Sequence, residues 1–367
     1  MKRAITIGVA AALTAVSAAA PAVAAGYDDW ILPSCGTVTG DGTVTYTRTE
    51  GEKITPTSNR LRPVVYTTGL VALDSPGTLL SIANGRLSSS TDTGCTWRQI
   101  GQVSGSHTEL VPASGGGAYA WDRDGNLSLA RTTGGVTPLT SPASEVAGIG
   151  VDRNQGERLR AADGDGQLHE STDGGRTWKP IGVPAWPQSE LLMVYTAVFD
   201  PKDLDHVVLG SAGDSRVTFD GGRTWTVATG MSSGGKVNVF SATISPVVGN
   251  LVWAMGLNLS ELDAGAPSDG RHIYMSTDGG RSYVPVVDQN SDITIPNGPL
   301  MTAHPTNPTV LYFVFGTGWS GIGTDIYRYD GRQKKVTTNH NSYDRVTSIA
   351  FNPASPSVMY LGVAEES

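Results

Sequence analysis

The side chains that could carry out acid–base, nucleophilic or metal-binding chemistry are scattered along this 367-residue chain. The six histidines stand singly, without a His-Glu-x-x-His or His-x-His pair at metal-ligating spacing. No Gly-x-Ser-x-Gly segment surrounds a serine, which argues against an α/β-hydrolase. The glycine clusters at 115–117 and 234–235 lack a following Lys-Ser/Thr, so we interpret them as loops rather than phosphate cradles. Local spacing therefore predicts no catalytic residue, no metal ligand and no cofactor.

Two segments resemble calcium-binding loops in composition. Residues 122–126 read Asp-Arg-Asp-Gly-Asn, and residues 163–167 read Asp-Gly-Asp-Gly-Gln. Both lack the downstream bidentate Glu of an EF-hand. Each lies between two expected strands, where Asp-Gly is a strong hairpin signal. We predict tight turns here, with calcium sites as the alternative.

One carboxylate recurs within a fixed pattern of neighbours. Each copy has Gly at the second position after the Asp, Thr or Ser at the fourth, and Trp or Tyr at the fifth. Asp can accept hydrogen bonds from backbone N–H groups of its own turn, Gly tolerates positive φ, and the aromatic ring supplies an apolar plug. We call these segments Asp-box turns and predict structural roles for their aspartates and aromatic residues: Asp92 and Trp97, Asp173 and Trp178, Asp220 and Trp225, Asp278 and Tyr283.

Short β-rich runs separated by turns fill the chain between the Asp-box turns. With 46 Gly, 21 Pro and only 16% charged residues, the composition favours many short strands over long helices. Units of four strands at intervals of about 40–58 residues are typical of propeller blades. We predict an all-β, seven-bladed β-propeller, with six or eight blades as alternatives.

The two ends of the chain predict how the ring closes. The last unit shows only two strands before Ser367, whereas N-terminal strands near 36–38, 43–48 and 52–54 belong to no complete unit. Half a blade would leave an open sheet edge. We therefore expect residues 25–60 to complete the last blade, residues 61–342 to form six full blades, and residues 343–367 to supply the inner strands of the last one.

The N-terminus predicts export. A basic start, an apolar Ala-rich run and a small-residue cleavage region mark residues 1–24 as a signal peptide, and no other stretch is long enough to span a membrane. Without this leader the net charge is near −10, which disfavours nucleic acid as a partner. Cys35 and Cys95 then predict one disulfide, with two free thiols or a metal pair as alternatives. We expect a secreted monomer.

The Asp-box turns resemble the repeat shared by sialidases, sortilin-type receptors, some glycanases and secreted bacterial propellers. In size, export, low cysteine content and turns, the chain is most similar to a family of secreted streptomycete propellers that are not enzymes. This resemblance implies a protein-binding role, in which the chain promotes self-cleavage of an extracellular neutral metalloprotease. It also implies that the chain is a transglutaminase substrate. The repeat identifies a fold well and an activity poorly.

Candidate binding residues come from the irregular loops. Residues 257–270 form the longest insertion and carry Glu261 and Asp263, while Trp319 lies in a glycine-rich loop and could anchor an interface. Gln155 and Gln289 lie in polar segments, which makes them our candidates for cross-linking by a transglutaminase.

The alternative function is a glycan-active enzyme or lectin of the sialidase type. Arg62 lies upstream of the first Asp-box turn, near the place where sialidases carry a catalytic arginine, but its neighbours differ from their pattern. Tyr312 and Tyr327 are candidate nucleophiles. This alternative requires three arginines, or two carboxylates about 5–10 Å apart, at one end of the central channel.

Overall fold

The computed structural model describes residues 29–61, 65–105, 107–187, 193–232, 235–316, 323–342 and 345–365. The signal peptide, Arg62 and Trp319 lie outside the described residues, so the expectations for them stay predictions. In the part of the chain that is described, no helix is long and apolar enough to cross a membrane.

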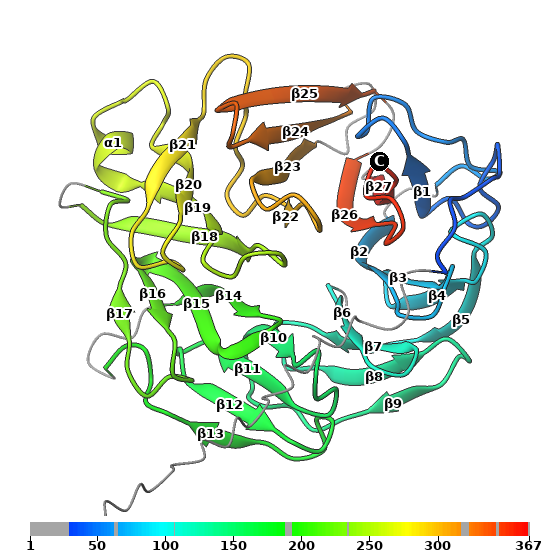
Figure 1. Ribbon diagram of the computed structural model, residues 1–367, viewed down its shortest axis with the longest axis horizontal. Helices are drawn as coiled ribbons and strands as arrows, with labels where there is room; N and C mark the ends of the chain where they lie inside the picture. Colours follow the sequence, from blue (N-terminus) through cyan, green and yellow to red (C-terminus); the bar gives the residue numbers. More distant parts are fainter. Residues whose placement is uncertain are drawn as a thin grey trace, which may run out of the picture.

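The strands pair antiparallel, mostly with their neighbours in chain order, and the resulting groups stand in a ring (Figure 1). The first three groups are β2 (Val65–Ala72), β3 (Leu79–Ala83), β4 (Arg86–Ser90) and β5 (Arg98–Gln102); β6 (Glu109–Ala113), β7 (Gly117–Trp121), β8 (Leu127–Arg131) and β9 (Val136–Pro138); and β10 (Val146–Val151), β11 (Leu159–Asp163), β12 (Leu168–Ser171) and β13 (Lys179–Ile181). The next three are β14 (Val194–Asp200), β15 (Asp203–Gly213), β16 (Ser215–Thr218) and β17 (Thr226–Val227); β18 (Val237–Ile244), β19 (Val252–Asn258), β20 (Arg271–Ser276) and β21 (Val284–Asp288); and β22 (Met301–Ala303), β23 (Val310–Gly316), β24 (Thr324–Asp330) and β25 (Lys335–Asn341).

The remaining strands come from opposite ends of the chain. β26 (Arg345–Phe351) pairs with β27 (Met359–Glu365), and β27 pairs with β1 (Val44–Thr47) over a register from Val44↔Gly362 to Thr47↔Met359. Ile54 forms a further antiparallel bridge to Thr47. An N-terminal strand thus completes the sheet begun by the C-terminal strands, as the unfinished last unit predicted.

The prediction of an all-β propeller is confirmed. The single described helix, α1 (Leu259–Asp263), has five residues. We interpret each strand group as one blade, which gives seven. The count stays an interpretation because the hydrogen bonding joins β15 to β18 and β27 to β2, merging neighbouring groups into larger sheets.

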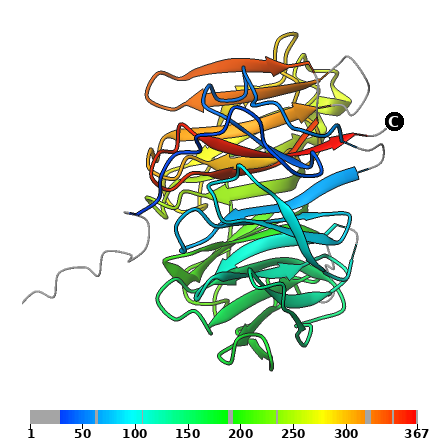
Figure 2. The same cartoon turned by 90° about the vertical axis from the view of Figure 1, so that its right-hand side faces the viewer.

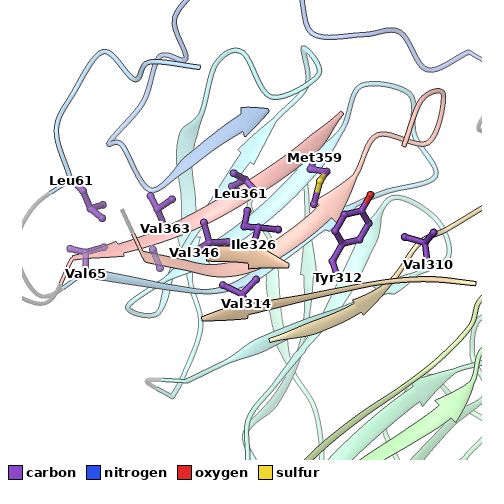
Figure 3. Close-up of a cluster of buried hydrophobic side chains, with 11 residues drawn as sticks. Leu61, Val65, Val310, Tyr312, Val314, Ile326, Val346, Met359, Leu361 and Val363 are labelled. Carbon is purple, nitrogen blue, oxygen red and sulfur yellow. The ribbon is translucent and has the colours of Figure 1, made fainter. Parts of the chain in front are cut away.

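The core lies between neighbouring groups rather than at one centre. Middle strands such as β3 and β7 are buried along their whole length, because each sheet is covered on both faces by the next groups in the ring. Figure 3 shows one such cluster, where Tyr312 and Val314 of β23 and Ile326 of β24 face Val346 of β26 and Leu361 of β27. The closing group is therefore packed like the others.

The up-and-down order of the strands gives the ring two distinct faces, seen edge-on in Figure 2. Connections between the second and third strands, and linkers between groups, emerge at one face, which we call the loop face. Connections between the third and fourth strands emerge at the opposite face and include all four Asp-box turns. The strand ends that line the central cavity belong to the loop face.

Candidate functional site

The Asp-box turns share one hydrogen-bond pattern. In the turn after β16, Thr218 Oγ1 donates to Asp220 Oδ1 (2.8 Å) and accepts from Gly222 N (2.9 Å). Asp220 also accepts from Thr224 N (2.9 Å) and Thr224 Oγ1 (2.6 Å). Asp92, Asp173 and Asp278 repeat these bonds, with Ser in place of Thr218 in each turn. The glycine at the second position after the Asp has φ between 83° and 98° in all four turns.

These bonds act on the acidity of the carboxyl groups. The hydroxyl and amide of Thr177 lower the pKa of Asp173 to about 2. For Asp220 and Asp278, partial burial acts to raise the pKa, but hydrogen bonds from the turn outweigh it and lower the pKa to about 2. All the groups that bind these carboxylates belong to the same turns, and the structural role of the four aspartates stays a prediction.

Replacing Asp278 by Asn should flatten the acid dependence of stability. The pKa of Asp278 in the folded protein is about 2, below the ordinary value of 3.8 for this side chain, so the ionised group stabilises the fold above pH 4 and that contribution is lost as pH falls toward 2. Thermal midpoints measured by circular dichroism from pH 5 to 2 should fall less steeply for the variant. Asp263→Asn, at an exposed aspartate of α1, is the matched control and should keep the slope of the unmodified protein. Equal slopes for all three would contradict the prediction.

The aromatic residues of the turns contact the preceding blade. The indole N–H of Trp178 donates to Thr140 O (2.9 Å), and that of Trp225 donates to Val183 O (2.9 Å). Tyr283 N donates to Thr229 O (2.9 Å). Each acceptor follows the outer strand of the previous group, so the turn joins two blades as well as two strands.

The first Asp-box turn makes the same contact with the N-terminal segment. Trp97 N donates to Thr39 O (2.7 Å), and Thr39 N donates to Cys95 O (2.8 Å). The predicted disulfide between Cys35 and Cys95 is confirmed, and it spans a sequence separation of 60 residues. The N-terminal segment therefore occupies the place of a preceding blade and is bound there covalently.

A cavity of about 830 Å³ lies inside the ring of inner strands. Its lining includes Glu109, Val146 and Arg345, each the first residue of its strand, and Trp121 and Gly316, each the last of its strand. These strand ends all belong to the loop face. The cavity falls within the 300–1,000 Å³ range typical of small-ligand sites.

The charged residues of the cavity differ in how they are paired. Arg123 donates to Glu145 Oε1 (2.8 Å) and to the carbonyl oxygens of Val194 (2.7 Å) and Tyr195 (3.3 Å), which joins three blades. Asp122 accepts from the backbone N–H (2.9 Å) and side-chain amide (2.8 Å) of Asn126. The 122–126 segment is thus a turn closed by its own side chains.

Glu109 has no such partner among the described residues. Its side chain is accessible to solvent inside the cavity but is surrounded by protein, and desolvation alone raises its pKa to about 7. Our sequence interpretation missed this residue. The sequence offered one signal, an acidic residue at the start of an otherwise uncharged inner strand. That signal does not identify a site, because only the assembled ring shows that the strand end lines a cavity.

The insertion at 257–270 contains α1 and lines one side of a second cavity of about 350 Å³, whose other side is lined by residues 230–232, His272, Tyr274 and Pro285. The ring nitrogens of His272 lie 2.7 Å from Glu261 Oε2 and 2.7 Å from Asp288 Oδ1. Glu261 also accepts from Asn258 (2.8 Å) and Ser268 (3.2 Å). Of the two predicted interface acids, Glu261 is therefore engaged within the insertion, whereas Asp263 is exposed.

The two candidate glutamines are held differently. Gln155 is exposed in the turn between β10 and β11. The amide of Gln289 donates to Asp269 (3.0 Å) and accepts from Ile295 N (3.1 Å). An enzyme that modifies the amide would have to break both bonds at Gln289, so the geometry favours Gln155.

The candidate nucleophiles of the glycan-active alternative are buried. Tyr312 is 1% exposed and donates to Glu50 Oε1 (2.8 Å), which also pairs with Arg328 Nε (3.3 Å). Burial raises the pKa of Tyr312 well above its ordinary value, with the Glu50 carboxylate acting in the same direction. Tyr327 is also 1% exposed. The Tyr312–Glu50 pair, which the sequence did not predict, links the N-terminal segment to β23.

Other histidines and carboxylates form local pairs. Asp163 accepts from Gln167 N (2.8 Å) and lies 2.9 Å from His169 Nε2, so the second calcium-like segment is also closed by its own residues. In the described ranges, no group of three or more His, Cys, Asp or Glu side chains is arranged to hold a metal ion.

The ring of antiparallel blades and its inner cavity define a protein of the β-propeller class. The chain is 47% identical over 371 residues to dispase autolysis-inducing protein of Streptomyces mobaraensis, covering 100% of this chain and 99% of the relative. The chain belongs to the family of that protein. No protein-family model matches it, so membership of the Asp-box repeat family stays a prediction.

Solved structures of low sequence identity share the fold. The GH74 xyloglucanase from Xanthomonas campestris matches with a TM-score of 0.57 at 14% identity, over 81% of this chain and 50% of the enzyme. The chain thus spans about half the length of that enzyme. YCF48, in a structure with a D1 peptide bound, matches with a TM-score of 0.55 at 13% identity, over 83% of this chain and 95% of YCF48. At these identities the likeness concerns the fold alone.

Proposed function

We propose that this chain is a secreted, non-enzymatic, protein-binding propeller that promotes autolysis of an extracellular neutral metalloprotease. The observation that carries the proposal is the end-to-end similarity, at 47% identity, to a protein named for inducing dispase autolysis. The described residues add a disulfide, which suits an oxidising compartment, and a cavity at the loop face that a partner can reach.

The glycan-active alternative gains no specific support from the geometry. The described lining of the cavity is charged, as that alternative requires, but it includes two arginines, Arg123 and Arg345, rather than three. Of its two carboxylates, Glu109 and Asp122, the second is bound by Asn126 within its own turn. Arg123 is bound to Glu145 and to backbone carbonyls, and the candidate nucleophile Tyr312 lies in the core. We therefore keep protein binding as the proposed function.

Incubation with a neutral metalloprotease tests the proposal. The equimolar protein should shorten the lifetime of full-length protease, followed by gel electrophoresis and by residual activity. A chelator that removes the catalytic zinc should stop the loss, which shows that the protease cleaves itself. An unchanged protease lifetime in the presence of the folded protein would argue against the proposal.

The same proposal includes a role as a transglutaminase substrate. Gln155→Asn should remove most of the incorporation of a labelled primary amine, because this side chain is exposed in a turn. Gln289→Asn is the matched control and should leave labelling unchanged, since its amide is held by Asp269 and Ile295. Peptide mapping of the labelled protein locates the site, and label found mainly at Gln289 would reverse our choice.

A further inference from the structure

Glu109 is the unusual residue of the loop-face cavity. It opens β6 and lies directly opposite Trp121 in the antiparallel ladder to β7, so both side chains stand on the same face of the sheet. Both residues line the cavity. The indole N–H of Trp121 is buried and lacks a hydrogen-bond partner among the described residues.

The carboxyl group of Glu109 is poorly compensated. Charged groups elsewhere in the lining are Asp122 and Arg123 from the end of β7, Arg345 from the start of β26, and the exposed His107 that precedes β6. Asp122 and Arg123 are held by Asn126 and Glu145, and desolvation is the one cause of the raised pKa of Glu109. Glu109 lines the cavity, is exposed to it and has no ion-pair or hydrogen-bond partner among the described residues, so a cation that enters the cavity can pair with its carboxylate.

Aromatic rings complete the surroundings of a cation. Tyr195 of β14 and Phe240 of β18 line the cavity with ring centroids 4.7 Å apart, and both are half-buried. Phe315 of β23 lines it as well. Aromatic faces attract ammonium and guanidinium groups and pack against the methylene stems that carry them.

We propose that the loop-face cavity receives a basic side chain, a lysine ammonium or an arginine guanidinium, from a peptide segment of a protein partner, with Glu109 as its counter-ion. This inference rests on the proposed function in one respect, since it takes the partner to be a protein. The chain is acidic, with a net charge of −8 over the whole sequence, which also favours association with a basic segment.

Two capped pentapeptides test the proposal: acetyl-Gly-Leu-Arg-Leu-Gly-amide and its counterpart with norleucine in place of Arg. Calorimetric or NMR titration of the full-length protein at pH 8 should show at least roughly tenfold tighter binding of the Arg peptide, equal to about 1.4 kcal/mol. Glu109→Gln should remove that preference, whereas Glu157→Gln, at an exposed glutamate in the turn between β10 and β11, should keep it. Equal binding of both peptides, or a preference that survives Glu109→Gln, overturns the proposal.

Proton linkage supplies a readout on the unmodified protein. Because the pKa of Glu109 is about 7, the preference for Arg should increase from pH 6 to pH 8 as the carboxyl group ionises. The pKa of Glu109, followed by carboxyl-carbon NMR, should fall when the Arg peptide is added. A pKa that does not move contradicts the proposal even if the variant fails to fold.

The protease assay separates this inference from the proposed function. If the unmodified protein shortens protease lifetime while the Arg peptide shows no preference, the cation site is wrong and the proposed function stands. If the Arg preference depends on Glu109 but protease lifetime is unaffected, the site stands and the proposed function fails.

Discussion

Replacing Cys35 and Cys95 together by serine should lower the free energy of unfolding by about 4 kcal/mol. The disulfide closes a loop with a sequence separation of 60 residues, so its removal returns a large amount of chain entropy to the unfolded state. The N-terminal segment would then be held to the first Asp-box turn by the hydrogen bonds of Thr39 and by packing. Equilibrium unfolding in urea, followed by tryptophan fluorescence, measures the change.

Reduction supplies the control for this prediction. The unmodified protein in a strong thiol reductant should unfold at the same urea concentration as the double serine variant, and the reductant should not affect that variant further. A double variant as stable as the oxidised protein would show that the closing segment is held by non-covalent contacts alone.

Replacing Trp97 by Ala should cost about 3–5 kcal/mol, the range for truncating a large buried aromatic residue. Trp97 is 7% exposed and packs in a cluster with Trp30, Val38 and Tyr46 of the N-terminal segment. The substitution leaves a void where the chain ends meet the first blade. Urea unfolding is again the measurement.

Trp225→Ala is the matched control for Trp97→Ala. Trp225 occupies the same position of its Asp-box turn, but it is only half-buried and packs at the edge of its cluster. We expect a clearly smaller loss of stability there. Equal losses would mean that the motif position, rather than the closing contact, determines the effect.

Both predictions concern the place where the ring is closed. Elsewhere the chain passes directly from one blade to the next, but the last blade is assembled from β26 and β27 at one end of the sequence and β1 at the other. Contacts between distant segments lose more chain entropy on loop closure than contacts within a hairpin do. A disulfide and a large buried ring at this position therefore offset a cost that the other blades do not have.

The sequence by itself determined the local parts of this protein. The spacing around Asp92, Asp173, Asp220 and Asp278 specified turns because all the required donors and acceptors lie within a few residues of each aspartate. The unfinished last unit indicated how the ring closes. The two cysteines, in a chain expected to be exported, indicated one disulfide. Each of these conclusions depends on hydrogen bonds within a turn, on the need to pair a sheet edge, or on disulfide chemistry. None of these requires knowledge of how the blades are arranged in the ring.

Only the tertiary structure decided which side chains meet. Glu109 became a candidate site because β6 places it inside the ring opposite Trp121, and Glu261 proved to be bound to His272, eleven residues further along the chain. The pairing of Tyr312 with Glu50 spans 262 residues and lies in the core rather than at a channel mouth. Local spacing carries no information on such contacts, because they depend on how the blades are arranged around a common axis.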